Sequence, residues 1–255
     1  MSSLSARKQE IARRFSSAAS TYASFADLQA AIADTLLDAC CPQGIVLDAG
    51  CGRGRESVLL SGHAAVEKVI ALDMAPAMLA AIPAVASVQP LPGDIEALPL
   101  PDASVDVVFS SFAMQWCESR EQACREIFRV LKPGGRLLAS VPGPDSLVVL
   151  RASGLLHVNE FASAQDWATA LMQAGFSACE FTQNDFSAHF VTVRELLHAL
   201  QGIGANTSDA PRDNHLRGKQ WLQQVTSALE QQREPAGLPL RYDVIFMQAT
   251  RETGN

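Results

Sequence analysis

The sequence predicts an open, doubly wound α/β fold, in which helices cover both faces of a parallel sheet. Three observations predict it. Short apolar runs alternate with helical stretches, hydrophobic residues make up 48% of the 255 positions, and a glycine-rich turn directly follows the first apolar run. Strands joined through helices form parallel pairs with right-handed crossovers, and the helices bury both faces of the sheet. The composition supplies enough apolar side chains for one large core.

The helical stretches carry apolar residues three and four positions apart, which is the spacing of one helix face. Ile11 and Phe15 show this spacing in the first stretch, and Leu28 and Ile32 show it in the second. The helices expected on this basis are residues 5–20, 24–40, 193–201 and about 218–231.

The strands are expected where short apolar runs stand between helical or loop stretches. The segment LKPGG at 131–135 should end a helix, because Pro and Gly interrupt helices, and a strand should then begin near Arg136. The last run, LRYDVIFMQATR, alternates between apolar and polar residues like a strand. The expected strands are residues 45–49, 68–73, 87–91, 105–111, 136–141 and 240–251.

Charge and hydropathy exclude several classes of protein. A net charge of −7 and a pI near 5.2 argue against general nucleic-acid binding, which draws on clustered Lys and Arg. The first twenty residues carry charges throughout and lack the apolar core of a signal peptide. Because the chain also has no run of about 18 apolar residues, we expect a soluble, cytoplasmic protein with no membrane contact.

The cysteines show neither a C-x-x-C motif nor an accompanying His pair at zinc spacing. The sequence therefore predicts no metal site. In a cytoplasmic protein such residues act as small core hydrophobes, so we expect all of them to be buried, reduced thiols. They are Cys40, Cys41, Cys51, Cys117, Cys124 and Cys179.

The stretch GCGRGRES at 50–57 follows the apolar run GIVLDA, and its alternating glycines suggest a turn that leaves room for a small molecule. In doubly wound sheets the ligand lies beyond the carboxyl ends of the strands. Three acidic residues stand at such ends: Asp48, Asp73 and Asp94. A carboxylate can accept two hydrogen bonds from a ribose diol, and Asp73, at the end of the second strand, is the candidate. Each could also be a solvated or helix-capping aspartate.

A nicotinamide dinucleotide is the obvious rival ligand, because its binding fingerprint is also rich in glycine. That fingerprint, G-x-G-x-x-G, needs a third glycine five residues after Gly50. Arg55 stands there, and the glycine comes one residue early, at Gly54. The turn therefore departs from the dinucleotide pattern.

Four segments together resemble the class I S-adenosylmethionine-dependent methyltransferases over residues 44–142. They are LDAGCGRG, ALDMAPAML, GDIEALPLPDASVDVVFSSFAMQW and EIFRVLKPGGRLLAS. The resemblance implies a Rossmann-like, seven-stranded sheet whose last strand is antiparallel, with N-terminal helices and a helical insertion forming a lid. It also implies S-adenosylmethionine as cofactor, S-adenosylhomocysteine as product, and no metal.

The same resemblance assigns roles to residues of this chain. The three glycines would pass the methionyl part of the cofactor, Asp73 would bind the ribose, and Asp94 with Ile95 would meet the adenine. Met74 would lie beside the adenine ring, although a Met after a strand is more often ordinary packing. The expected cofactor-binding residues are Asp48, Gly50, Gly52, Gly54, Asp73, Met74, Asp94 and Ile95.

The flanking segments narrow the resemblance. FSSAASTYASFADLQ, AMQWC, HVNEF and LQGIGAN resemble the malonyl-acyl carrier protein O-methyltransferases of biotin synthesis. This implies transfer of a methyl group to the free carboxylate of a malonyl thioester, carried by the phosphopantetheine of acyl carrier protein or by CoA. Two alternatives stay open: a methyltransferase for another small molecule, such as a quinone precursor, or a non-catalytic protein that only binds the cofactor.

The acceptor chemistry predicts few catalytic groups. A carboxylate is already ionised at pH 7, so its methylation needs no general base, and we expect no catalytic triad. Positioning and loss of water should supply the catalysis. Tyr22, Gln115 and Trp116 are candidates for positioning, and each has an ordinary packing role as its alternative. The expected acceptor-side residues are Tyr22, Gln115, Trp116, His157, Asn159 and Arg212.

The chain is expected to form one methyltransferase domain over residues 1–255. Within it we expect an N-terminal helical cap (1–42), a cofactor-binding core (43–142), acceptor-side helices with an insertion (143–232), and a final strand and tail (233–255).

Overall fold

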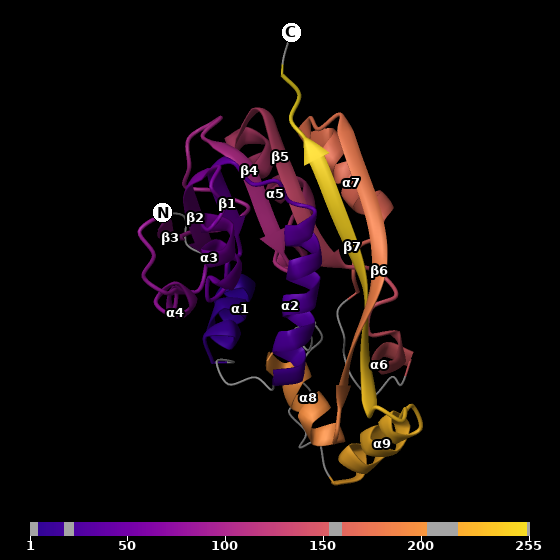
Figure 1. Ribbon diagram of the computed structural model, residues 1–255. Coiled ribbons are helices and arrows are strands. Elements are labelled where there is room, and N and C mark those ends of the chain that lie inside the picture. Colours follow the sequence, from indigo (N-terminus) through magenta and orange to yellow (C-terminus); the bar gives the residue numbers. More distant parts are fainter. Residues whose placement is uncertain (1–4, 18–22, 153–159, 203–218, 254–255) are drawn as a thin grey trace.

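The computed structural model describes residues 5–17, 23–152, 160–202 and 219–253. These residues form a seven-stranded sheet with the strand order β3-β2-β1-β4-β5-β7-β6 (Figure 1). The first five strands run parallel, and β7 is antiparallel to both of its neighbours. The strands are β1 Gly44–Ala49, β2 Val66–Asp73, β3 Val88–Pro92, β4 Val105–Ser111, β5 Leu131–Pro142, β6 Ala178–Phe190 and β7 Leu238–Thr250.

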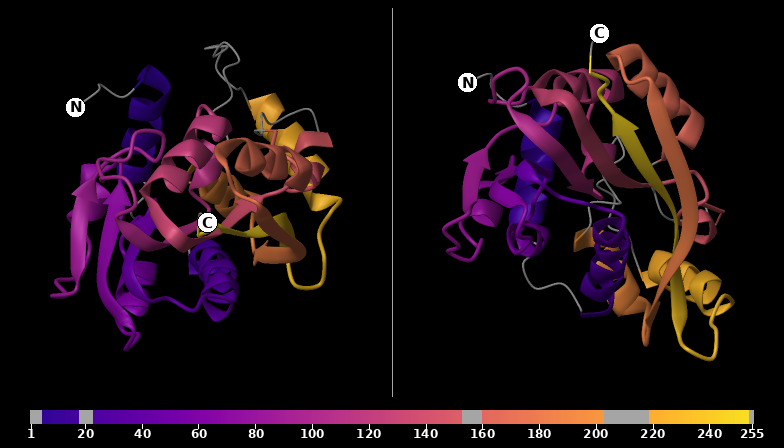
Figure 2. Two further views of the ribbon diagram at one scale, coloured as in Figure 1. Left: turned by 90° about the horizontal axis from the view of Figure 1, so that it is seen from above. Right: turned by 45° about the horizontal axis from the view of Figure 1, so that its top comes forward.

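Helices lie on both sides of this sheet (Figure 2). One side carries α2 and α3, and the opposite side carries α5 and α7. The described helices are α1 Ala6–Ser17, α2 Ala23–Asp38, α3 Arg55–Ser61, α4 Pro76–Leu79, α5 Arg120–Val130, α6 Val148–Ala152, α7 Ala164–Ala174, α8 Val193–Gly202 and α9 Lys219–Glu230, with a 3-10 turn, η1, at Met114–Trp116.

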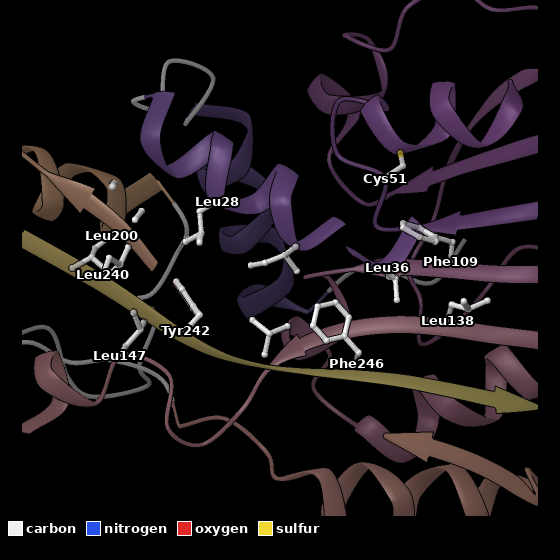
Figure 3. Close-up of a cluster of buried hydrophobic side chains, with 14 of the residues drawn as sticks. Leu28, Leu36, Cys51, Phe109, Leu138, Leu147, Leu200, Leu240, Tyr242 and Phe246 are labelled. Atoms are coloured by element: carbon white, nitrogen blue, oxygen red, sulfur yellow. The ribbon is translucent and has the colours of Figure 1, made fainter. Parts of the chain in front are cut away.

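The strand sequences explain why both faces are covered. Successive side chains of a strand point to opposite faces. In β7, Val244 and Phe246 join the core cluster on the α2 side, whereas Ile245 and Met247 join the cluster on the α5 side. All four are buried, so both faces of this part of β7 are covered. Figure 3 shows the first cluster, where β7 side chains such as Tyr242 and Phe246 meet α2.

The predicted doubly wound fold is confirmed, as are the sheet of seven strands and its antiparallel last strand. The helices expected at 5–20, 24–40, 193–201 and 218–231 are present as α1, α2, α8 and α9. The lid expected from the N-terminal helices and the insertion stays a prediction.

The expected start of the fifth strand is wrong. LKPGG does not separate helix from strand, because β5 begins at Leu131, directly after α5. The pairing of β5 with β4 shifts register between Val105 and Val107, and Gly134 has a positive φ of 83° at this point. The Pro-Gly-Gly segment is therefore a bulge within the strand, where extra residues are accommodated and glycine supplies the unusual backbone angle.

One strand, β6, has no counterpart among the expected strands. It pairs with β7 along its full length, from Ala178 to Phe190, and forms the edge of the sheet. Its middle, TQND, is exposed and carries no apolar run. An edge strand need not be apolar, so a short apolar run, which predicts the other strands, is absent from β6.

The expectation that all six cysteines are buried is also wrong. Cys40, Cys51 and Cys124 are buried, but Cys117 and Cys179 are half-buried and Cys41 is exposed. Cys41 lies after the end of α2, beyond the helix face that packs on the sheet. All six are free thiols.

Candidate functional site

The topology brings two loops together at the centre of the sheet. β1 and β4 are neighbours, yet the chain runs from β1 outward to β2 and β3 before returning to β4. Such a reversal creates a crevice at the carboxyl ends of the two strands, where open α/β sheets bind ligands. The glycine loop (residues 50–54) follows β1, and the β4 turn (residues 112–117) follows β4.

The glycine loop depends on backbone angles that favour glycine. The φ angles of Gly50, Gly52 and Gly54 are 83°, 53° and 79°. A side chain on Gly50 would lie 2.2 Å from the Cβ atom of Ala113, and one on Gly54 would lie 2.8 Å from the side chain of Ile82. A side chain on Gly52 would meet nothing within 4 Å. Two glycines therefore allow close packing, whereas Gly52 faces open space.

Asp73 holds this loop from the end of β2. Its Oδ2 accepts the backbone N–H of Gly52 at 2.9 Å, and its Oδ1 accepts that of Ala75 at 2.8 Å. Burial raises the pKa of Asp73, and these backbone hydrogen bonds oppose the rise. With the N–H of Met74, three backbone groups donate to a carboxylate that has about four acceptor positions, so acceptor capacity remains for a hydroxyl group of a ligand. Asp73 therefore combines a fixed orientation with spare acceptor capacity.

Asp48 lies beneath the loop and is buried. Its Oδ2 accepts a hydrogen bond of 2.5 Å from the hydroxyl of Ser57 on α3. The pKa of Asp48 is raised to about 7, mainly by burial and also by the charges of Glu56 and Asp73, while the Ser57 hydrogen bond opposes the rise. Asp48 thus links the glycine loop to the helix that follows it, and its role toward a cofactor stays a prediction.

The third acidic residue, Asp94, lies in the turn after β3. The turn is joined to β2, because the N–H of Gly93 donates to the backbone carbonyl of Asp73 at 3.1 Å. Asp94 is not free, since its Oδ2 pairs with the ammonium of Lys8 on α1. The next residue, Ile95, is buried, and its Cδ1 lies 3.8 Å from the position of a Cβ atom on Gly50. Met74, after β2, is half-buried.

The β4 turn contains a strained residue and an unsatisfied polar atom. Phe112 has a φ of 52°, which is uncommon for a residue with a side chain. Its carbonyl oxygen accepts the side-chain Nε2 of Gln115 at 2.8 Å. The amide of Gln115 cannot be turned over, because its oxygen would then face the carbonyl oxygen. Its buried Oε1 has no hydrogen-bond partner within the described part of the chain. Strain and unpaired buried groups are both concentrated at functional sites.

The other predicted acceptor residues have different outcomes. Trp116 is half-buried in η1, and its backbone N–H donates to the carbonyl of Ala113 at 3.1 Å. Four of the predicted residues lie outside the described residues: Tyr22, His157, Asn159 and Arg212.

Three residues beside the site carried no usable signal in the sequence. Lys8 reads as one of many charges on a surface helix, and Phe112 as the end of an apolar run. Tyr242 falls on the alternation of the last strand, yet only 3% of its surface is exposed. Its ring packs edge to face against Phe112, with centroids 5.4 Å apart, and burial raises the pKa of its hydroxyl.

The described residues contain no group of three or more His, Cys, Asp or Glu side chains arranged to hold a metal ion. None of their helices combines the length and apolar character needed to cross a bilayer.

Known proteins share both the sequence of this region and the fold. A family model described as a methyltransferase domain matches residues 47–139, which include the glycine loop, Asp73 and the β4 turn. The YcgJ protein from Bacillus subtilis shares the fold, with a TM-score of 0.63 and 20% identity over 88% of this chain and 98% of that one.

Two relatives extend the similarity over nearly the whole chain. A malonyl-acyl carrier protein O-methyltransferase from Methylovorus sp. is 38% identical over 95% of this chain and 88% of its own length. A biotin biosynthesis bifunctional protein from Cellvibrio japonicus is 37% identical over 94% of this chain, which spans only 49% of that relative. The chain therefore belongs to the family of the malonyl-acyl carrier protein O-methyltransferases.

Proposed function

We propose that this methyltransferase esterifies the free carboxylate of a malonyl thioester, with S-adenosylmethionine as methyl donor and malonyl-acyl carrier protein as acceptor. Full-length similarity to relatives bearing that name supports the acceptor. The observation that carries the proposal is the open space at Gly52 beside the Asp73 carboxylate, at the switch point of the sheet.

The residues present fit the cofactor. Gly52 presents no side chain to the open space, and a residue with a Cβ atom would fill it. Asp73 keeps acceptor capacity for a ribose hydroxyl. Ile95, which is buried near Gly50, and Met74, which is half-buried after β2, are apolar residues suited to contact a flat heterocycle. When bound, S-adenosylmethionine supplies a methyl group made electrophilic by the adjacent positive sulfur.

The chain's own task is to bring a carboxylate oxygen in line with that methyl group. The nucleophile carries its charge at pH 7, since a carboxyl pKa is near ~4, and no proton must be removed. Holding two reactants in a productive geometry can contribute roughly 7–11 kcal/mol, and excluding water from the carboxylate adds to this. We therefore assign the protein a positioning role and no general base.

Gln115 is the residue best suited to meet the acceptor. A primary amide has two N–H donors, and only one of them is needed for the carbonyl of Phe112. The second N–H can donate to the malonyl carboxylate, and the unpaired Oε1 can accept from an amide N–H of phosphopantetheine. Both would satisfy a side chain that the described protein leaves half-satisfied.

The proposed reaction has a physical consequence for its product. A free carboxylate is costly to bury in an apolar pocket unless it is paired. Its methyl ester carries no charge, so the masked chain can enter apolar sites of enzymes that lengthen acyl chains.

The test is a methyl-transfer assay with malonyl-acyl carrier protein and labelled S-adenosylmethionine, using acetyl-acyl carrier protein as the control. We expect label in a base-labile ester of the malonyl carrier and none in the acetyl carrier, which lacks the carboxylate. Single-turnover rates should be flat between about pH 6 and 8, because the nucleophile stays ionised. Preference for quinol acceptors, a rate that rises with an apparent pKa near ~7, or cofactor binding without turnover would overturn the proposal.

A further inference from the structure

The N-terminal helix α1 contacts the rest of the protein through a buried charged side chain as well as through apolar residues. It lies against α4, which follows β2, and against α8, on the side of the molecule toward which the arrowheads of β4 and β5 point (Figure 1). Among the side chains of α1 that the structure describes, those of Lys8, Ile11 and Ala12 are buried. A buried lysine is unusual, because an ammonium is costly to bury unless it is paired.

Lys8 reaches two carboxylates from different parts of one turn. Its Nζ lies 2.5 Å from Oδ2 of Asp94 and also pairs with Oε2 of Glu96. The exposed fractions of the three side chains are 7%, 16% and 9%. We call these three residues the Lys8 cluster. Its members come from α1 and from the turn after β3, which lie far apart in the sequence.

The charges of the Lys8 cluster depend on one another. Burial by itself lowers the pKa of Lys8, but its hydrogen bonds to Asp94 and Glu96 outweigh that effect and raise the pKa overall. Without the ammonium, two buried carboxylates would face each other with no cation between them. Removing one partner of a buried ion pair leaves an uncompensated charge, which disturbs the local structure.

The rest of the turn gives Glu96 and Asp94 fixed positions. Glu96 accepts the backbone N–H groups of Glu118 at 2.9 Å and Ser119 at 2.7 Å, at the start of α5. Asp94 accepts the backbone N–H of Glu96 at 3.0 Å through its other oxygen. Lys8 therefore joins α1 to a turn that also anchors α5.

This turn is connected to the cofactor residues by backbone hydrogen bonds. The N–H of Gly93 donates to the carbonyl oxygen of Asp73, and the carboxylate of Asp73 accepts the N–H of Gly52. A displacement of the turn would therefore move the residues that face the proposed cofactor. The path from Lys8 to Gly52 runs through Asp94, Gly93 and Asp73.

We propose that Lys8 is a positioning residue for the cofactor: it docks α1 on the acidic turn and holds that turn in its binding conformation. Docking of α1 and binding of S-adenosylmethionine are then coupled, each favouring the other. This rests on the cofactor half of the proposed function and is independent of the identity of the acceptor. A purely structural ion pair would instead change the stability of the fold and leave cofactor affinity as it is.

The experiment compares the full chain with Lys8→Met, which keeps the length of the side chain and removes the ammonium. Calorimetry should show at least about tenfold weaker binding of S-adenosylmethionine. Hydrogen exchange should show that the cofactor slows exchange across residues 6–13 in the parent chain and not in the variant. Lys8→Arg, which can pair with both carboxylates, should bind within about threefold of the parent.

Lys132→Met is the matched control. Lys132 also forms a lysine-aspartate pair, with its Nζ 2.8 Å from Oδ2 of Asp106, but at the amino-terminal ends of β4 and β5. This variant should keep the parental affinity. If Lys8→Met does not fold, the double variant Lys8→Met with Glu96→Gln removes one charge of each sign and is compared with Glu96→Gln alone.

Parental affinity in a folded Lys8→Met chain, or cofactor protection of α1 that persists in it, would overturn the proposal. Equal loss of affinity in Lys132→Met would do the same, because it would show a general effect of lost ion pairs. A parent chain that binds the cofactor but does not methylate a malonyl thioester contradicts the proposed acceptor and leaves this inference intact. A parent chain that does not bind the cofactor contradicts both.

Discussion

The two loops at the switch point, the glycine loop after β1 and the β4 turn, are built in opposite ways. In the glycine loop the backbone N–H groups have hydrogen-bond partners. Those of Gly50 and Cys51 both donate to the carbonyl of Leu72, and that of Gly52 donates to the carboxylate of Asp73. In the β4 turn, Phe112 is strained and the Oε1 of Gln115 is unpaired within the described residues.

This difference indicates different tasks for the two loops. A loop whose polar groups are paired before a ligand arrives is preorganised, and binding costs it little rearrangement. A buried acceptor without a partner favours any ligand that supplies a donor, because pairing removes an existing cost. We therefore expect changes in the glycine loop to act on the cofactor and changes in the β4 turn to act on the acceptor.

The largest effect should come from Gly52→Val, which tests the open space in the glycine loop. A valine would occupy the space that Gly52 leaves free, so S-adenosylmethionine should bind at least about a hundredfold more weakly, or about 2.7 kcal/mol. Its φ of 53° also costs roughly 1–3 kcal/mol of stability. Calorimetry and thermal unfolding measure the two effects separately.

Gly134→Val is the control for backbone strain. Gly134 has a φ of 83°, and a side chain there would lie 3.5 Å from Thr253, in ordinary contact, at the bulge of β5. It should lose stability and keep cofactor affinity. Parental affinity in folded Gly52→Val would remove the glycine loop from the cofactor site.

The next effect should come from Asp73→Ala. The variant loses the acceptor for a ribose hydroxyl and the carboxylate that holds Gly52, so cofactor affinity should fall about ten- to hundredfold, roughly 1.4–2.7 kcal/mol. Equilibrium binding measures this. Asp106→Ala also removes a carboxylate that accepts a backbone N–H, that of Ile45, but at the other end of the sheet. If both variants lose affinity equally, the effect is not local to the glycine loop.

Asp48 tests how the glycine loop is supported from beneath. Its pKa in the folded chain is about 7, mainly because of burial, against an ordinary value of 3.8. Between these values the unfolded chain has released its proton and the folded chain has kept it, so stability falls as pH rises and levels off above about 7. The slope approaches about 1.4 kcal/mol per pH unit.

Asp48→Asn cannot ionise, and it keeps an acceptor for the Ser57 hydroxyl. Its stability relative to the parent should therefore rise between pH 5 and 7 and level off above about pH 7. Urea unfolding of both chains without cofactor at each pH measures this. If the stabilities of the two chains change with pH in the same way, Asp48 does not titrate in this range.

The smallest effect should come from Gln115→Met, which tests the β4 turn. The KM for malonyl-acyl carrier protein should rise about five- to tenfold, or about 1–1.4 kcal/mol, because a hydrogen bond to the acceptor is lost. Cofactor affinity should be unchanged. Gln183→Met, on the exposed edge strand β6, should leave both values as they are. A loss of cofactor affinity in Gln115→Met would end the division of tasks between the loops.

The acceptor side was harder to predict than the cofactor side for a physical reason. The glycine loop and Asp73 are close in sequence to the strands that position them, and their residue types follow from backbone angles and hydrogen bonding. Phe112 is instead surrounded by distant segments, since its N–H donates to Ser140 on β5 and its ring packs on Tyr242 on β7. No local pattern encodes these contacts. Four predicted acceptor residues, Tyr22 among them, stay predictions because they lie outside the described residues.

The sequence by itself determined the alternation of strands and helices, the glycine loop, and the acidic residues at the ends of three strands. These are local features, set by side-chain periodicity and by the backbone freedom of glycine. Only the tertiary structure decided which glycine faces open space, that the polar strand β6 completes the sheet, and that Lys8 pairs with Asp94. These depend on contacts between segments far apart in the chain, because the burial of a charge and the space beside a backbone atom exist only after those segments have packed.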